Sequence, residues 1–261
     1  MRKLTQKEKK FFVKNGYLHL KSIISNKKIS NFKRTFFDLF HHYSGFNSSK
    51  NFNDPNLVKM FKKFRNKNKK NFFYFFRTVS LTSTFNDLYT DNILKELAGN
   101  LLKTNKLNLI IAEPQLRIDE PNDKSFVLDW HQDAAHYAQD PTGKNSLVFN
   151  ITVQKITEEM GSVKLKVGSH KKGIYKFSNL KKIKKSKVLQ LMPNKKNLKN
   201  NNFKTTFLNS NPGDIIIYDM RLLHKSGINS SNKIRLSVIS RAFNPMVKSF
   251  RSFRYLTQIL N

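Results

Sequence analysis

With 261 residues, 38% of them hydrophobic, the chain is long enough for one sizeable domain, and its lack of Cys excludes disulfides, thiolate metal sites and thiol nucleophiles. Its net charge of +32 is spread from end to end, mostly as Lys, without an RNP, finger or basic-helix pattern, so we expect no nucleic-acid partner, although a preference for anionic small molecules stays open. Charged residues begin too early for a signal peptide and no apolar run reaches spanning length, which predicts a cytoplasmic protein without a membrane partner.

Two helices are predicted near the N-terminus. Thr5 stands three residues before Glu8, which is the spacing of a capping box, and Gly16 is a natural helix stop. These signals predict a short helix followed by a strand. Over residues 26–43 the apolar side chains recur at steps of three and four, which predicts an amphipathic helix whose Phe-rich stripe faces the core.

The rest of the N-terminal region alternates between turn signals and helical patterns. Residues 44–56 are polar and rich in turn formers, so we expect a break there. Helix is expected again over residues 71–81, and from Asp91 to a stop at Gly99. Residues 1–105 are therefore predicted to form a mostly helical flank.

Beyond residue 105 the pattern changes to short runs rich in β-branched and aromatic residues, broken by Gly, Pro, Asn and Asp. The runs lie at residues 107–118, 146–156, 161–168, 187–192, 205–209, 213–219 and 233–243. Many short strands without intervening helices predict an antiparallel sandwich or barrel with the helices packed outside it. We expect one domain over residues 1–261, in which 106–245 form the β core and 246–261 a C-terminal tail.

The stretch DWHQDAAHY, residues 129–137, suggests a metal site. Residues two apart on a strand point to the same face, so His131 and Asp133 would both face the interior while Gln132 faces away. Two protein ligands hold a metal weakly, and His224, which follows a predicted strand, is the best candidate for a third. Two His and one carboxylate leave three coordination positions open, which is the arrangement of non-haem Fe(II) oxygenases.

An arginine follows the third candidate ligand at a useful distance. Arg235 lies eleven residues after His224, which allows a turn and a return strand that bring its guanidinium back beside the metal. A guanidinium can bind a carboxylate through two parallel hydrogen bonds, and a Lys cannot do so with the same directionality. The expected anion is the distal carboxylate of 2-oxoglutarate, with its other end and dioxygen on the open metal positions.

Four segments of the sequence resemble the phytanoyl-CoA dioxygenase family of Fe(II)- and 2-oxoglutarate-dependent oxygenases. The opening helix and strand (residues 4–25) and the segment leading into the HxD motif (115–133) are similar to that family. So are the glycine-serine-histidine turn (160–173) and the distal His and Arg region (211–243). HxD alone is a weak signal, whereas the ordered set at these spacings is a strong one.

The resemblance implies a double-stranded β-helix, a cupin-like relative of the jelly roll. It assigns iron to His131, Asp133 and His224, and 2-oxoglutarate to Arg235, Ser226 and Gln115. In related halogenases a small residue replaces the carboxylate ligand, and the presence of Asp133 therefore favours hydroxylation with release of succinate and carbon dioxide.

Four further residues are candidate contacts for a small-molecule substrate, namely Arg117, Trp130, His136 and Tyr137. Each has a plainer alternative, because Arg117 could form a salt bridge and the two aromatic residues could belong to the core. His170 lies in a turn flanked by glycines, where hydrogen bonds to the backbone are expected rather than a metal.

Two other classes of function remain open at this point. A cupin-like enzyme could isomerise or hydrolyse a small molecule without oxygen, with zinc or manganese at the same three ligands. A noncatalytic protein could bind anions through its positive charge. Oxygen consumption coupled to succinate release would support the oxygenase against both.

Overall fold

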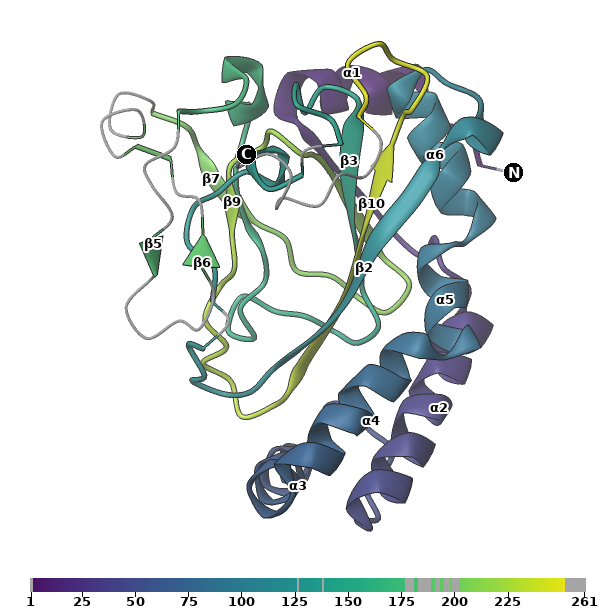
Figure 1. Ribbon diagram of the computed structural model, residues 1–261, viewed down its shortest axis with the longest axis vertical. Helices are drawn as coiled ribbons and strands as arrows, with labels where there is room; N and C mark the ends of the chain where they lie inside the picture. Colours follow the sequence, from purple (N-terminus) through teal and green to yellow (C-terminus); the bar gives the residue numbers. More distant parts are fainter. Residues whose placement is uncertain are drawn as a thin grey trace.

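A computed structural model describes residues 2–125, 127–137, 139–176, 181–182, 189–190, 193–194, 198 and 202–251 of the chain. Figure 1 shows a layer of helices, a larger antiparallel sheet, and a smaller antiparallel sheet on the side away from the helices. Most of the predicted C-terminal tail and most of the predicted strand at 187–192 lie outside the described residues. Within the described part of the chain, no helix is both long and apolar enough to cross a membrane.

The chain opens with α1 (Gln6–Asn15) and β1 (Tyr17–Leu20), as predicted. Both halves of the capping box are present. The backbone N–H of Glu8 donates to the Thr5 hydroxyl (3.2 Å), and the backbone N–H of Thr5 donates to the Glu8 carboxylate (2.8 Å). Gly16 ends the helix with a φ of 83°, a left-handed conformation that favours glycine, and turns the chain into β1.

Five further helices complete the flank: α2 (Asn26–Ser44), α3 (Pro55–Lys67), α4 (Lys69–Leu81), α5 (Ser83–Tyr89) and α6 (Asn92–Leu102). The predicted stripe of α2 is fully buried and packs through its rings. Phe40 stacks on Phe61 with a centroid distance of 4.7 Å, and Phe36 meets Phe75 edge-on at 5.3 Å. Aromatic packing of this kind adds to the burial of apolar area, so α2 to α4 form one compact arm.

The sequence prediction of this region needs two corrections. The helix α3 was not expected, although Asp54 caps it and Pro55 occupies its first turn, which are both helix-start signals. Gly99 does not stop the last helix, which continues to Leu102 and is capped by Lys103 in a left-handed conformation with a φ of 52°. A Cβ at Gly99 would lie 2.8 Å from the carbonyl oxygen of Thr104, so this glycine allows a close backbone approach inside the helix.

The larger sheet has the strand order β1-β8-β3-β10-β2, and every neighbouring pair is antiparallel. Its long strands are β2 (Ile110–Asp119), β3 (Ser146–Ile151), β8 (Ile215–Asp219) and β10 (Arg235–Phe243). The smaller sheet has the order β7-β4-β9 and consists of β7 (Thr205–Phe207), β4 (Lys164–Lys166) and β9 (His224–Lys225). A separate two-stranded sheet pairs β5 (Lys181–Lys182) with β6 (Leu189–Gln190). The antiparallel β core with helices outside it agrees with the prediction.

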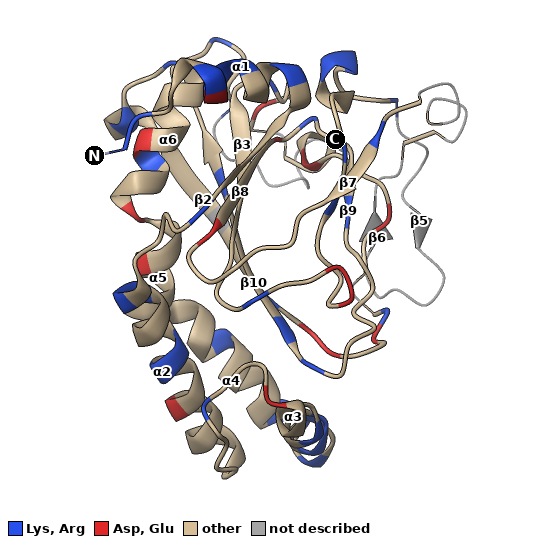
Figure 2. Cartoon of the chain, turned by 180° about the vertical axis from the view of Figure 1, so that it is seen from behind, with Lys and Arg blue, Asp and Glu red and all other residues tan. Residues whose placement is uncertain are grey.

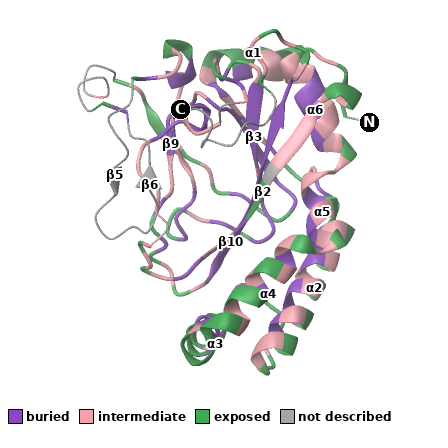
Figure 3. Ribbon diagram, viewed as in Figure 1, coloured by how far each residue is buried: buried purple, intermediate pink, exposed green. Residues whose placement is uncertain are grey.

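Alternate residues of the larger sheet face two different cores. Phe149 and Val238 pack with the helices, whereas Val148 and Tyr218 belong to a second cluster on the side of the smaller sheet. Every residue of β10 is buried, because both faces of this strand are covered (Figure 3). Polar side chains on the inner face of β10 are therefore removed from water, whereas many of the described Lys and Arg residues lie on helices and loops around the molecule (Figure 2).

Candidate metal centre

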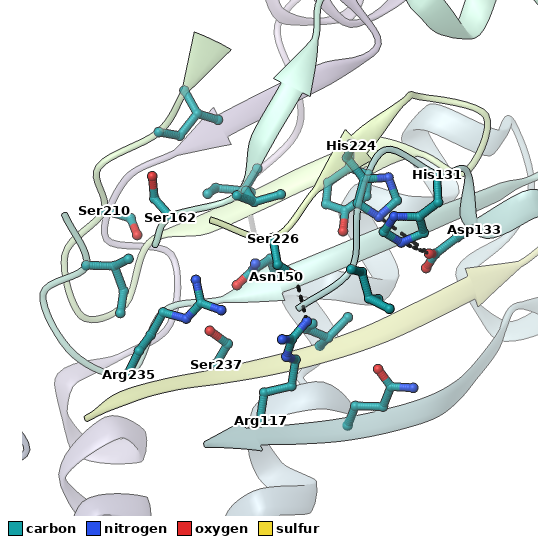
Figure 4. Close-up of a pocket in the computed structure, with 18 of the residues that line it drawn as sticks. Arg117, His131, Asp133, Asn150, Ser162, Ser210, His224, Ser226, Arg235 and Ser237 are labelled. Atoms are coloured by element: carbon teal, nitrogen blue, oxygen red, sulfur yellow. Dashed lines mark hydrogen bonds and ion pairs between the residues drawn. The ribbon is translucent and has the colours of Figure 1, made fainter. Parts of the chain in front are cut away.

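Three side chains predicted as metal ligands converge between the two sheets. Oδ1 of Asp133 lies 3.4 Å from Nε2 of His131 and 3.4 Å from Nε2 of His224. One ligand atom from each of the three lies within 4.8 Å of the others, all three residues are buried, and Figure 4 shows them pointing toward one another. Among the described residues, no other group of three His, Asp or Glu has this geometry.

The backbone brings these residues together differently from the prediction. His131 does not lie on a continuous strand but forms an isolated antiparallel bridge with His224, in which each N–H donates to the other's carbonyl at 2.9 and 3.0 Å. Asp133 begins a 3₁₀ turn, Asp133–Ala135. A bridge and a turn, rather than the alternation of a strand, therefore place the carboxylate beside both imidazoles.

Gln132, between the two motif residues, faces away from the centre, as expected. Its side-chain amide donates to the carbonyl of Gly173 (2.8 Å), and its amide oxygen accepts from the N–H of Tyr175 (2.8 Å). The Gln132 side chain is completely buried. These bonds tie the motif to the segment after His170 and hold its backbone in place.

Hydrogen bonds determine which nitrogen of each imidazole faces the centre. Nδ1 of His131 lies 2.7 Å from the carbonyl oxygen of Asp129, and Nδ1 of His224 lies 2.9 Å from that of Leu222. A carbonyl oxygen only accepts, so each Nδ1 carries the proton and each Nε2 presents a lone pair to Asp133. Burial lowers the pKa of His131 to about 4, which keeps this ring neutral at pH 7.

Arg241, which the sequence analysis did not single out, is paired with the carboxylate of the centre. Its Nε and Nη2 donate to Oδ2 of Asp133 at 3.0 and 2.8 Å. Burial alone would raise the pKa of Asp133, but the charge of the Arg241 guanidinium holds that pKa well below its usual range. The signal for Arg241 was its even spacing, six residues, from Arg235, since residues 235, 237, 239 and 241 share one face of β10.

Arg235 lies on the inner face of β10 at the other end of the same pocket, away from the His-Asp-His group (Figure 4). It is 5% exposed, and its Nε and Nη2 donate to Oδ2 of Asp119 at 3.1 and 2.8 Å. Asp119 stands directly opposite on β2. The predicted clamp therefore has a carboxylate partner that the sequence analysis missed, although Asp119 shares a strand face with Gln115 and Arg117.

Arg117, Ser226 and Gln115 also line this pocket. Arg117 forms the salt bridge that was the alternative to a substrate contact, since its Nη2 donates to Oδ1 of Asp119 at 2.8 Å. Its Nη1 donates to the hydroxyl of Ser226 at 2.9 Å. One carboxylate thus holds two guanidiniums, and the structure brings together all the residues expected to bind 2-oxoglutarate.

Of the other three candidate substrate contacts, His136 and Tyr137 lie beside residues of the centre, whereas the ring of Trp130 lies beside two lysines. The Nζ atoms of Lys166 and Lys225 both lie 5.0 Å from the ring centroid of Trp130. The ring of Tyr137 lies 4.8 Å from the guanidinium carbon of Arg241. The ring of His136 lies 6.2 Å from that of His131, and burial lowers the pKa of His136.

His170 has the structural surroundings that its turn suggested. Its Nε2 lies 3.1 Å from the carbonyl oxygen of Val13 in α1. A Cβ at Gly16 would lie 2.4 Å from its Nδ1, so the ring packs tightly against the end of that helix. His170 therefore joins the smaller sheet to the N-terminal helix and is not part of the metal-ligand group.

The sequence matches the model of the family described as phytanoyl-CoA dioxygenase (PhyH) over residues 12–237. No curated protein sequence matches the chain. Many solved structures do. One is the epimerase SnoN in complex with Fe3+, alpha ketoglutarate and nogalamycin RO, with a TM-score of 0.63 and 15% identity over 92% of this chain and 83% of that one.

Two further structures show the same likeness. EctD from S. alaskensis with 2-oxoglutarate and 5-hydroxyectoine has a TM-score of 0.62 and 16% identity over 95% of this chain and 82% of that one. AviO1 from Streptomyces viridochromogenes Tue57 has a TM-score of 0.55 and 15% identity over 96% of this chain and 100% of that one. At this identity the likeness establishes the fold, and the predicted double-stranded β-helix with outer helices is confirmed.

Proposed function

The chain belongs to the phytanoyl-CoA dioxygenase family, and from that premise we propose that it is an Fe(II)- and 2-oxoglutarate-dependent dioxygenase that hydroxylates a small organic substrate, releasing succinate and carbon dioxide. The observation that carries the proposal is the buried His-Asp-His group with Arg235 in the same pocket. The iron and alpha ketoglutarate in the SnoN structure, and the 2-oxoglutarate in that of EctD, support the assignment of cofactors. We propose that residues 1–261 act as a single catalytic unit.

The three donors fit ferrous iron. Nε2 of His131, Nε2 of His224 and Oδ1 of Asp133 form a set of two imidazoles and one carboxylate, which suits an iron centre that keeps positions open for other ligands. The hydrogen bonds of each Nδ1 to a backbone carbonyl orient the rings for this role. We propose that these three atoms hold the metal.

The pocket between the metal donors and Arg235 suits a dicarboxylate. Asp119 fixes the guanidinium of Arg235 through Nε and Nη2, so the clamp is oriented before any ligand arrives. We assign Arg235 and Ser226 to the distal carboxylate and Gln115 to the other end of the cosubstrate. Bound iron and 2-oxoglutarate supply the oxidising chemistry, in which one atom of dioxygen enters a C–H bond of the substrate and the other enters succinate.

The chain itself orients these groups and excludes water from them. Asp133 stays ionised beside Arg241, and both imidazoles are buried. The proposed contacts of the substrate are Arg117, Trp130, His136 and Tyr137. A guanidinium in that set suits a substrate with an anionic group, because charge-assisted hydrogen bonds are the strong ones.

A second reaction is a specific alternative, because SnoN is an epimerase. The same centre could remove hydrogen from a carbon and return it on the other face without inserting oxygen. The mass of the product formed under ¹⁸O₂, measured by mass spectrometry, distinguishes the two reactions. Incorporation of ¹⁸O supports hydroxylation, and an isotope-free product of unchanged mass supports epimerisation.

The experiment that tests the proposal begins with protein loaded anaerobically with Fe(II) and 2-oxoglutarate. A panel of candidate metabolites is added with oxygen, and succinate is measured for each. His224→Ala is the control, since it removes one of the three proposed donors. Succinate formation that depends on oxygen and is lost in the control supports the oxygenase, whereas turnover of a substrate without oxygen consumption supports a non-oxidative metalloenzyme instead.

A further inference from the structure

The pairing of Arg241 with Asp133 adds a residue to the centre beyond its ligands. We propose that Arg241 is a positioning residue that restricts Asp133 to binding the metal through one oxygen and compensates the charge of that ligand. This inference rests on the proposed function, because it needs a metal at the three donors.

The two carboxylate oxygens of Asp133 have different partners. Oδ2 accepts both hydrogen bonds from Arg241, at 3.0 and 2.8 Å. Oδ1 faces Nε2 of His131 and of His224, each at 3.4 Å. A carboxylate with both oxygens available can bind a metal through one or both of them. With Oδ2 occupied by a guanidinium, Oδ1 alone is left for the metal, and the number of open metal positions does not fall.

The guanidinium is itself held firmly in this position. Arg241 is 5% exposed, and it lies on the buried strand β10. The ring of Tyr137 lies 4.8 Å from its guanidinium carbon, which is a cation–π distance. Because a guanidinium presents a planar pair of donors, and an ammonium group does not, the Nε and Nη2 contacts fix the angle of the carboxylate as well as its place.

The pairing also changes the charge that a bound metal presents. Two neutral imidazoles and one carboxylate would offset one of the two positive charges of a divalent ion. The guanidinium cancels the carboxylate, so the centre keeps the full charge of the ion in a buried site where charge interactions are poorly screened. Arg241 should therefore weaken the binding of the cation and strengthen the binding of anions to the open positions of that cation.

The test measures these two effects separately, with Co(II) as the metal and oxalate as a chelating anion too short to span the pocket. Arg241→Met removes the charge and every donor, Arg241→Gln removes the charge and the planar pair of donors but keeps a polar amide, and Arg241→Lys keeps the charge. Arg65→Met is the matched control, since Arg65 also pairs with a buried carboxylate, with its Nη1 2.7 Å from Oε1 of Glu120, but lies on α3 outside the pocket. Binding of Co(II), and then of oxalate to the loaded protein, is followed by titration calorimetry.

We expect Arg241→Met and Arg241→Gln to bind Co(II) about tenfold more tightly and oxalate about tenfold more weakly than the parent. Arg241→Lys and Arg65→Met should stay within about threefold for both ligands. A crystal structure of the Co(II)-loaded parent should show one oxygen of Asp133 on the metal, and that of Arg241→Met should show both. If Arg241→Met does not fold, Arg241→Gln carries the same comparison.

General disorder of the site would weaken the binding of both Co(II) and oxalate. If the two affinities of Arg241→Met change in the same direction, or do not change, the inference is wrong. If the crystal structure of Co(II)-loaded Arg241→Met shows only one Asp133 oxygen on the metal, Arg241 does not position the carboxylate. Failure of the parent to bind Co(II) at all is a different result, because it contradicts the proposed function itself.

Discussion

Replacement of Asp119 by Asn should destabilise the fold through two buried guanidiniums at once. The Asp119 carboxylate holds Arg235 through Oδ2 and Arg117 through Oδ1, with contacts between 2.8 and 3.1 Å. The Asn side chain keeps the size and loses the charge, which leaves both cations without their shared counterion. Removing one partner of a buried pair typically costs about 3–5 kcal/mol, so we expect the free energy of unfolding to fall by about 4 kcal/mol.

Urea denaturation followed by far-UV circular dichroism measures this loss. Asp38→Asn is the matched control, because Asp38 pairs with Lys50 at 3.1 Å while its side chain is 55% exposed. An exposed pair contributes about 0–1 kcal/mol, and the control should stay close to the parent. A loss at Asp119 no larger than that of the control would show that other groups compensate the two arginines, and our account of the pocket would be wrong.

The acid stability of the protein provides an independent check on Asp119. Burial raises its pKa, but the charges of Arg235 and Arg117 more than offset this effect and lower the pKa below the usual 3.8. Its contribution is therefore present above pH 3.8 and is lost as the pH falls through the lowered value. Asp119→Asn should flatten the pH dependence of stability in that acidic range.

Three further outcomes are expected. Arg235→Lys should raise the KM for 2-oxoglutarate by about tenfold or more with little change in kcat, because one ammonium replaces a planar pair of donors, and unchanged cosubstrate affinity would contradict the clamp. His224→Ala should abolish Co(II) binding and succinate formation while the circular dichroism spectrum stays that of the parent; metal binding of parental strength would remove His224 from the centre. Gly16→Ala should lower the free energy of unfolding by about 2 kcal/mol or more, measured in urea, since its φ is 83° and the new Cβ would lie 2.4 Å from the His170 ring.

Local signals predicted those parts of the fold that depend on neighbouring residues. The capping box at Thr5, the stop at Gly16 and the stripe of α2 involve residues within a few positions of one another, and all three are present. The helix α3 was missed because the turn-rich segment before it, and its own many Lys and Asn residues, hid the start signal at Asp54. The role of Gly99 was also misread, since the close approach of Thr104 depends on the path of the next segment.

In the candidate centre, too, the residue types could be predicted from the sequence, but their tertiary contacts could not. His131, Asp133 and His224 could be chosen from the sequence because the chemistry of a metal site limits the residue types, but the bridge between the two histidines could not be foreseen. Asp119 and Arg241 were missed because their partners depend on which residues of different segments meet. The pairing of Arg235 with Asp119 follows from the register of β10 against β2, which one sequence does not specify.

The backbone bridge between His131 and His224 has a consequence for how the protein acquires its metal. The two residues are distant in the chain, and each donates its N–H to the other, so the donor atoms meet only after the two sheets have closed on one another. An unfolded chain keeps only the local pair of His131 and Asp133, and two protein ligands hold an ion weakly. We therefore expect tight metal binding only after the chain has folded, and chelators that remove the metal should leave an apoprotein with the same backbone that can be reloaded.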